Sequence, residues 1–258
     1  MPLDLVDQPR RRYRDNPLTQ VICQVRFPVL QRFDEPGFLG PVQDVLRDRY
    51  PRAVQEQQIG LVVGPGGVMP AQDAGKLWRF QDAEQAWSIV LGRDFFGVET
   101  ARYEQFEVLR DRLRDVLPVI LSLGVNWRER MGLRYVNQIR HPDGRTPSKW
   151  RELLNPMFLG MVGGDELGAD VIHAIQEIRL REQDGVLLIR HGLIGPEASN
   201  DNPFYLLDLD YADESPQPLH PDQLIEQVSS YHETIHNVFE MTLTPSMREH
   251  LGEDGVIE

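Results

Sequence analysis

The chain of 258 residues contains a single cysteine, Cys23, and no apolar run that approaches the length of a transmembrane helix. One cysteine excludes an intrachain disulfide, and a membrane span needs about 18 or more consecutive apolar residues. The N-terminal stretch MPLDLVDQPRRRYRDNPL also lacks the apolar segment of a secretory signal. We therefore expect a cytoplasmic protein without a membrane-embedded part.

Several catalytic and nucleotide-binding motifs are missing as well. No Gly-x-Ser-x-Gly elbow is present, and no Gly-Lys-Ser/Thr follows the glycines of VVGPGGVMP, which favours a surface loop over a phosphate cradle. Cys23 shares the apolar side of an alternating strand pattern with Val21 and Val25, as a core residue would. These patterns do not favour an enzyme of the hydrolase or P-loop classes.

Positive charge is scarce, because 27 basic residues stand against 40 acidic ones and the formal net charge is −13. Such a charge repels nucleic acid at long range and disfavours it as a partner. One segment departs from this balance: residues 126–151 hold seven basic and two acidic residues, and seven minus two gives +5. This segment, or the open face of the sheet, is therefore a candidate surface for a partner.

Hydrophobic periodicity divides the chain into two similar halves. Alternation predicts a strand over TQVICQVRFPVL, followed by a helical stretch at 35–50, further strands with a hairpin near Arg93-Asp94, and a long amphipathic helix from Tyr103 to Ile120. A second series runs in the same order: a strand at RERMGLRYVNQIRH, a helical stretch interrupted at Pro156, a hairpin around residues 183–185, a strand at PFYLLDLDYADE, and a final helix that begins near Pro221.

This duplication predicts an α+β fold with two tandem β-α-β(3-4)-α repeats. The repeats would form one continuous, curved antiparallel sheet with helices on one face, an arrangement like that of the TATA-binding protein. The predicted organisation is a flexible N-terminal tail over 1–15, a first repeat over 16–124 and a second over 125–258, packed as one pseudo-symmetric unit.

The final helix contains His-Glu-x-x-His in the stretch YHETIHNVFE. Helical spacing places His232 and His236 on one face, as a zinc site requires, and Glu233 could act as general base. No third ligand stands at the spacing of known proteases, and the same helix supplies the core stripe of the second repeat. The pattern favours a structural role, with a zinc-dependent hydrolase as the alternative.

Arginines on the polar side of two strands are the strongest binding candidates. Arg26 and Arg134 occupy matching positions of the two repeats and point away from the apolar side of their strands. Guanidinium groups suit carboxylate or phosphate recognition, and they equally suit ion pairs with neighbouring acids. The full set of candidate binding residues is Arg26, Arg134, Asn137, Arg140 and Arg190.

Asp208 and Asp210 form an Asp-x-Asp pair on one side of a predicted strand. Two carboxylates in this arrangement could hold Mg²⁺ or Mn²⁺. They could also pair across strands with Arg179, Arg181 or Arg190. The second interpretation is the simpler one.

Several of these stretches together resemble a sporadically distributed bacterial family of about 250 residues. The stretches are YRDNPLTQVICQVRFPVL, LWRFQDAEQAWSIVLGRDFFGVETARYEQF, RMGLRYVNQI, LLDLDYADE and HETIHNVFEMTLT. The residues that match the family pattern are Asn16, Pro17, Leu18, Arg134, Tyr135, Asn137, Asp208, Asp210, His232, Glu233, Phe239 and Glu240. His236 lies outside it. The resemblance implies no reaction, and the patchy occurrence of the family is like that of accessory genes of bacterial defence systems.

The sequence thus predicts a binding or interaction protein without a cofactor. An accessory or antitoxin-like subunit of a bacterial defence or toxin system is the most specific form of this prediction. A protein partner is expected, and the oligomeric state is left open.

Overall fold

The computed structural model describes residues 7–57, 61–64, 67–70, 75–145, 147–163, 171, 173–182, 184–195 and 203–256. The described chain is a mixed α/β protein dominated by an antiparallel sheet of nine strands, in the order β11–β12–β13–β10–β2–β8–β7–β6–β3. It divides into two compact units, each assembled from separate stretches of the chain. Unit 1 comprises 1–21, 133–213 and 227–258, and unit 2 comprises 22–132 and 214–226.

The α+β class and the antiparallel sheet predicted from the sequence are therefore present. The two units do not coincide with the two predicted repeats, because the boundaries cut through the strands β2 (Leu18–Arg26) and β10 (Arg130–Ile139). Each of these strands contributes residues to both units.

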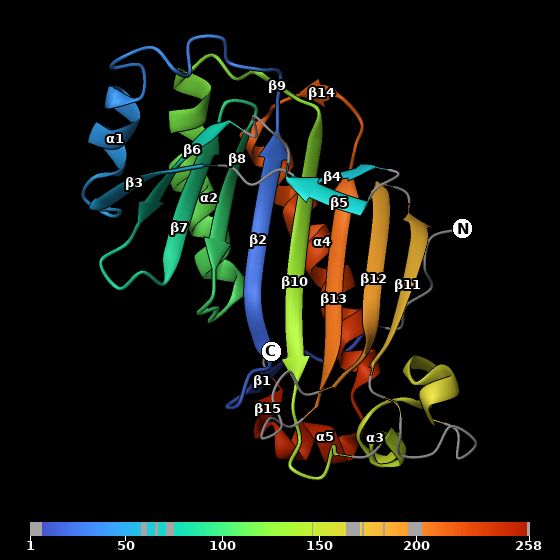
Figure 1. The fold of residues 1–258 in the computed structure, drawn as a ribbon. Coiled ribbons are helices and arrows are strands. Elements are labelled where there is room, and N and C mark those ends of the chain that lie inside the picture. Colours follow the sequence, from blue (N-terminus) through green and yellow to red (C-terminus); the bar gives the residue numbers. More distant parts are fainter. Residues whose placement is uncertain are drawn as a thin grey trace. The chain divides into compact units, whose positions relative to one another are not determined.

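Unit 2 contains a meander packed on a long helix. Antiparallel hairpin connections join β6 (Lys76–Gln81), β7 (Trp87–Gly92) and β8 (Phe95–Thr100), and β3 (Arg52–Gln57) pairs with β6. The helix α2 (Phe106–Ser122) lies behind β7 and β8 (Figure 1) and buries one apolar stripe. The helix α2 lies where the sequence predicts a long amphipathic helix. The hairpin of β7 and β8 turns at Arg93-Asp94, as predicted.

Shorter elements complete unit 2. They are α1 (Gly40–Leu46), the hairpin of β4 (Leu61–Gly64) and β5 (Gly67–Pro70), and the small pair of β9 (Trp127–Arg128) and β14 (Gln217–Pro218). The helix α1 is shorter than the helical stretch expected at 35–50, because the residues on both sides of it form separate turns instead of continuing the helix.

Unit 1 contains four strands packed on the final helix. The strands β11 (His173–Glu182), β12 (Gly185–Ile194) and β13 (Phe204–Asp213) pair in continuous antiparallel register, and β10 follows β13 in the sheet. The helix α4 (Pro221–Thr242) lies behind β10 and β13 (Figure 1), where Tyr231 stacks on Tyr211 with ring centroids 4.0 Å apart. Among the described residues of unit 1, the opposite face of these strands carries no helix.

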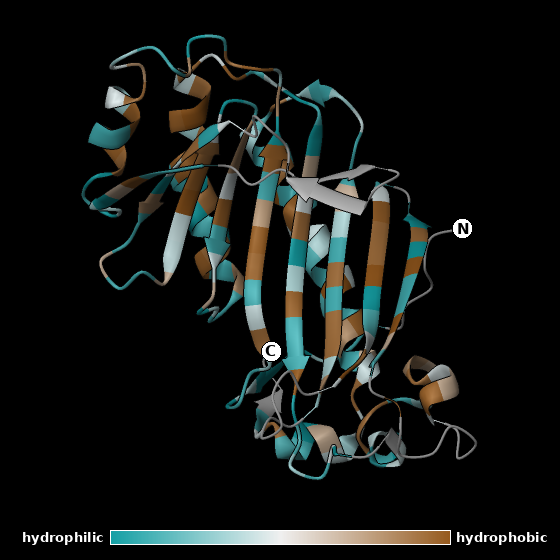
Figure 2. Cartoon of the chain, in the orientation of Figure 1, coloured by the Kyte–Doolittle hydropathy of each residue, from teal (hydrophilic) through white to brown (hydrophobic). Residues whose placement is uncertain are grey.

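Alternation along these strands explains why one of their faces carries the buried core residues and the other carries the charged ones. In β13, Tyr205, Leu207, Leu209 and Tyr211 are buried on the α4 side, while the residues between them turn to the other face. Figure 2 shows the same alternation of hydrophilic and hydrophobic residues along β10 and β13. The period-2 pattern read from the sequence therefore assigns the strand faces correctly.

The ends of unit 1 are tied together at one side of α4. The strand β1 (Arg11–Tyr13) pairs with β15 (Glu253–Val256), which follows the short helix α5 (Pro245–His250). The sequence predicts a flexible tail over 1–15, whereas residues 11–13 form this strand. The helical stretch interrupted at Pro156 contains α3 (Trp150–Leu153) and three 3-10 turns at Pro147–Lys149, Pro156–Phe158 and Gly160–Gly163.

No helix within the described ranges is both long enough and apolar enough to cross a membrane.

A glycine in β12 tests the packing of this sheet. Gly192 has φ +150°, and a Cβ added there would overlap the carbonyl oxygen of Ala174 on the neighbouring strand β11. A Cβ on Gly97, also buried in a strand, would meet the carbonyl oxygen of Cys23 at an ordinary 3.5 Å. We expect Gly192→Ala to lower the free energy of unfolding by about 2 to 3 kcal/mol and Gly97→Ala to change it by much less. Urea unfolding followed by circular dichroism measures both, and equal effects of the two variants would contradict this register.

Candidate functional site: the helix-free face of unit 1

A row of charged side chains crosses the face of unit 1 that α4 leaves uncovered. Glu177 on β11 stands opposite Arg190 on β12, and Arg190 stands opposite Asp208 on β13. Arg134 of β10 reaches the same aspartate from the other side. Paired residues of antiparallel strands share a face, so the register of four strands brings these side chains together. We call this surface the helix-free face; its charged residues on β10–β13 are Arg134, Arg140, Glu177, Arg179, Arg181, Arg190, Asp208 and Asp210.

Asp208 is the centre of the row. The guanidinium of Arg134 donates two hydrogen bonds to its carboxylate, from Nε to Oδ1 and from Nη2 to Oδ2, both 2.7 Å long. Arg190 donates from Nη1 to Oδ2 at 3.4 Å. Only 5% of the Asp208 side chain is exposed, so its negative charge is neutralised almost entirely by these two arginines.

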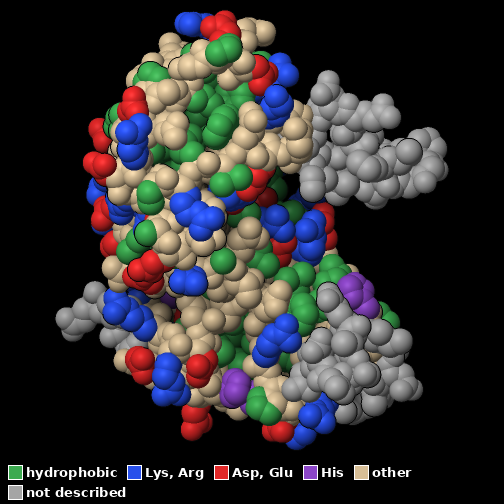
Figure 3. Space-filling model, turned by 60° about the vertical axis from the view of Figure 1, so that its left-hand side comes forward, with side chains coloured by type: hydrophobic (Ala, Val, Ile, Leu, Met, Phe, Trp, Pro, Cys, Tyr) green, Lys and Arg blue, Asp and Glu red, His purple; other side chains and the backbone are tan. Residues whose placement is uncertain are grey.

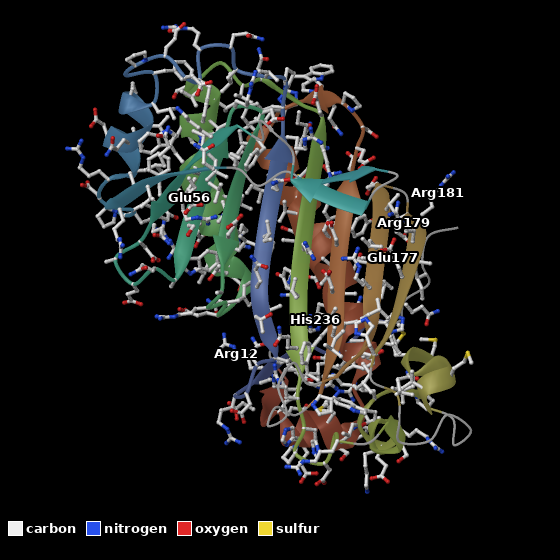
Figure 4. The ribbon with its side chains drawn as sticks, in the orientation of Figure 1. Arg12, Glu56, Glu177, Arg179, Arg181 and His236 are labelled. Carbon is white, nitrogen blue, oxygen red and sulfur yellow. The ribbon has the colours of Figure 1, made fainter. Side chains whose placement is uncertain are left out.

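Glu177 extends the row to β11. It accepts a hydrogen bond of 3.0 Å from Nη2 of Arg190 and one of 3.2 Å from Nε of Arg179. Figure 4 shows Glu177, Arg179 and Arg181 projecting from β11. Among the described residues, Arg181 makes no ion pair.

Hydrogen bonds within the row keep Arg134 and Glu177 ionised near neutral pH. The hydrogen bonds of Asp208 raise the pKa of Arg134 above its ordinary value, and burial opposes this only in part. The hydrogen bonds from Arg190 and Arg179 hold the pKa of Glu177 below its ordinary value. Arg134 and Glu177 therefore keep their charges.

Positive charge is in excess on this face. Five arginines and three acids lie on it, and five minus three gives +2, in a chain whose net charge is −13. Because Arg134 and Arg190 use only part of their five N–H donors on Asp208, remaining donors can donate to a further carboxylate or phosphate.

Apolar side chains border the charged row on both sides. Ile175 of β11 and Val186 of β12 are exposed, and Leu188, Leu206 and Phe204 are partly exposed on the same face. Charged groups flanked by accessible apolar groups are typical of surfaces that contact other proteins.

The five arginine and asparagine candidates do not form one site. The structure brings Arg134 and Arg190 together through Asp208, as the cross-strand interpretation of the Asp-x-Asp pair predicted for Arg190. Arg140 lies at the end of β10, with its guanidinium 4.6 Å from the centre of the Phe204 ring. Arg26 belongs to unit 2, where it lies 3.7 Å from Asp94.

Asn137 lies on the opposite face of β10 from Arg134. It is buried on the α4 side, and its Nδ2 donates a hydrogen bond of 3.1 Å to the carbonyl oxygen of Leu207. Residues whose numbers differ by an odd number lie on opposite faces of a strand. Asn137 therefore supports the packing of β10 on β13 and does not reach the helix-free face.

The basic segment 126–151 does not act as one free surface. Arg128 is buried. Nε of Arg130 lies 3.9 Å from Oε1 of Glu214, and Nζ of Lys149 lies 3.8 Å from Oε2 of Glu152. Most of the excess charge predicted there is thus paired or buried, and the segment contributes to the helix-free face through Arg134 and Arg140.

The His-Glu-x-x-His residues lie on α4, with the two histidine rings 6.3 Å apart. The Nδ1 atom of His232 is 3.0 Å from the hydroxyl of Tyr135, and Nε2 of His236 is 3.4 Å from the carbonyl oxygen of Pro9. Glu233 forms an ion pair with Arg10. Within the described ranges, no three His, Cys, Asp or Glu side chains come close enough to share a metal ion.

Burial, followed by the charges of His236 and Arg10, lowers the pKa of His232 to about 3. The ring is therefore neutral at physiological pH, and it is partly buried beside Tyr135 in unit 1. This environment matches the structural interpretation of the motif.

A second buried carboxylate escaped the sequence prediction of site residues. Glu240 of α4 is fully buried, and it is bound by Nη1 of Arg11 at 2.9 Å, the hydroxyl of Tyr13 at 2.9 Å and Nε of Arg248 at 3.3 Å. The signal in the sequence was the run RRRYR at 10–14, which contains four arginines and no acidic residue and is followed by Asp15. This cluster fastens β1 and α5 to the end of α4.

No protein-family model matches the chain, and no curated protein matches it in sequence. The resemblance to a bacterial family therefore stays a prediction.

The depressed pKa of His232 has a consequence for stability. The unfolded chain binds a proton at this ring below about pH 6.5, and the folded chain only near pH 3. Between these values the unfolded state binds more protons, so the free energy of unfolding falls as the pH falls, by up to about 1.4 kcal/mol per pH unit. We expect His232→Gln to weaken this decrease between about pH 7 and about pH 5, measured by urea unfolding, and the exposed His220→Gln to leave it unchanged. Equal pH slopes in wild type and His232→Gln would contradict the burial of a neutral ring.

The metal hypothesis has its own measurement. Because Tyr135 and Pro9 each engage one ring nitrogen of the two histidines, Arg10 pairs with Glu233, and no third ligand lies nearby among the described residues, we expect purified, untagged protein to hold far less than one zinc per chain by mass spectrometry. About one zinc per chain, lost in His232→Ala/His236→Ala, would restore the hydrolase alternative.

Proposed function

We propose that the chain is a binding protein whose contact surface for a protein partner is the helix-free face. The observation that carries the proposal is the buried Asp208 carboxylate, which is bound by two arginines whose side chains remain 39% and 38% exposed. Holding two long side chains in place before binding reduces the entropy lost when a partner docks. Arginine in such a fixed setting is a frequent contributor to binding energy at protein interfaces.

A protein partner fits this surface better than a nucleic acid does. Glu177 and Asp208 stand between the arginines, and exposed Ile175 and Val186 flank them, whereas nucleic-acid surfaces are strongly basic. Elsewhere on the molecule the charges are mixed as well: Figure 3, in which the left-hand side of Figure 1 comes forward, shows acidic and basic side chains interspersed. The net charge of −13 opposes a polyanion further.

We propose a bacterial defence or toxin system as the biological setting of this binding protein. An accessory or antitoxin-like subunit of a bacterial defence or toxin system agrees with a surface built for a partner and with the family resemblance of the sequence. The resemblance is what supports this setting.

The strand order supports a duplicated origin of the two halves. In unit 2 the first strand, β2, lies beside the last strand of its meander, β8, followed by β7 and β6; in unit 1 β10 lies beside β13, followed by β12 and β11. We infer from this equivalent order that the chain contains two related strand–helix–meander–helix elements. The likeness to the TATA-binding protein stays a prediction.

Affinity capture from the native host with matched bait variants tests the function. Ile175→Glu/Val186→Glu places two charges among exposed apolar residues of the helix-free face, and Val45→Glu/Val54→Glu does the same at exposed positions of unit 2. We expect the first bait to lose a specific partner by about tenfold or more and the second to retain it. The proposal fails if no bait recovers a specific partner, or if both variants lose it equally.

A further inference from the structure

The strand β11 is the outermost strand of unit 1. Among the strands that the structure describes, β12 is its only neighbour, and the ten residues of β11 pair with β12 without a register shift. The outer side of such a strand presents alternate N–H and C=O groups at the spacing that another strand needs. A regular edge of this length can accept a partner segment in extended conformation.

The side chains of this edge are accessible. Exposed residues occupy most of the strand, namely His173, Ile175, Gln176, Glu177, Arg179 and Arg181. The helix-free face of β11 carries, in order, Ile175, Glu177, Arg179 and Arg181 at intervals of two residues. An added strand would therefore meet one apolar, one acidic and two basic side chains in sequence.

The charges of β11 are unequally satisfied. Glu177 is held by Arg190 and Arg179 of the same chain, whereas Arg179 remains 72% exposed and Arg181 makes no ion pair among the described residues. Opposite charges on directly facing strand residues stabilise a pair, and like charges destabilise it. The free charge at this edge therefore calls for acidic residues opposite Arg179 and Arg181.

We infer that the protein partner contributes an extended acidic segment that adds to β11 as a further antiparallel strand. Its pattern on the helix-free face is acidic-x-acidic-x-basic-x-apolar, read opposite Arg181, Arg179, Glu177 and Ile175 in turn. This inference rests on the proposed function, and it specifies the conformation and the charge pattern of the segment that binds beside the helix-free face. The antiparallel direction is the one in which β11 pairs with β12.

A second copy of this chain is the competing occupant of the edge. Two β11 strands could pair, but each brings two arginines and one glutamate on this face, so the arginines would outnumber the acidic residues opposite them. The acidic segment of a different protein supplies an acidic residue opposite each arginine.

The probe is a fluorescein-labelled, N-acetylated and C-amidated peptide, Thr-Glu-Thr-Glu-Thr-Lys-Thr-Val-Thr, measured by fluorescence anisotropy with the full chain. We expect saturable binding that weakens about tenfold or more in Arg179→Glu/Arg181→Glu. Arg47→Glu/Arg93→Glu alters exposed arginines of unit 2 with the same change of net charge, and it should bind the probe as wild type does. Equal weakening in both variants, or none, overturns the inference.

Two N-methylated forms of the probe separate strand pairing from charge attraction alone. Methyl groups on alternate residues block either the N–H groups that face β11 or those that face away. Strand addition requires one form to bind like the parent peptide and the other to lose about tenfold or more in affinity. Equal affinities of the two forms overturn the inference.

Two further outcomes separate this inference from the proposed function. If the probe fails to bind but the captured partner is still lost with Ile175→Glu/Val186→Glu, strand addition is wrong and the helix-free face remains the binding surface. If sedimentation shows a dimer of the chain alone that Arg179→Glu/Arg181→Glu dissociates, a second copy occupies the edge and the acidic-partner inference is overturned.

Discussion

The surface of unit 1 depends on one buried carboxylate. Asp208 lies on β13 with a nearly inaccessible side chain, and an ionised carboxylate in that position is tolerated only when it is paired and hydrogen-bonded. Arg134 and Arg190 supply that pairing from the strands on either side. The requirement acts in both directions, because the aspartate that needs two cations also prevents their guanidinium groups from moving freely. A fixed pair of arginines on the helix-free face follows from this constraint.

The same constraint links the register of the sheet to function. Arg190 faces Asp208 and Glu177 only in the observed pairing of β11, β12 and β13, and a shift by one residue would turn these side chains to the α4 side. Gly192 helps to hold the register, because β11 approaches its backbone too closely for any side chain. Exposed Arg179 and Arg181 then stand at the edge of the sheet as a continuation of the charged row.

Local patterns in the sequence were sufficient for much of the fold. Period-2 alternation identified the buried side of β2 and of β13, the hairpin at Arg93-Asp94 formed as expected, and the final helix begins at Pro221. Arg190 was one of three arginines named as cross-strand partners for Asp208 and Asp210, and it stands opposite Asp208. Helical spacing likewise placed His232 and His236 on one face of α4.

Long-range contacts were beyond these patterns. Arg134 and Asp208 are 74 positions apart, and their pairing depends on β10 lying beside β13, which no local period reveals. Arg11 and Glu240 are 229 positions apart, so a segment that looks like a charged tail becomes a strand tied to a buried carboxylate. Asn137 was assigned to the site by residue type, although its position relative to Arg134 already places it on the buried face. Hydrogen exchange of the β11 backbone, measured on the chain alone and on its complex with the captured partner, tests the central claim most directly. The account predicts slower exchange at alternate amides between Ala174 and Glu182, with the helix-free face protected beside them. Protection confined to unit 2, with the β11 amides unchanged, would contradict it.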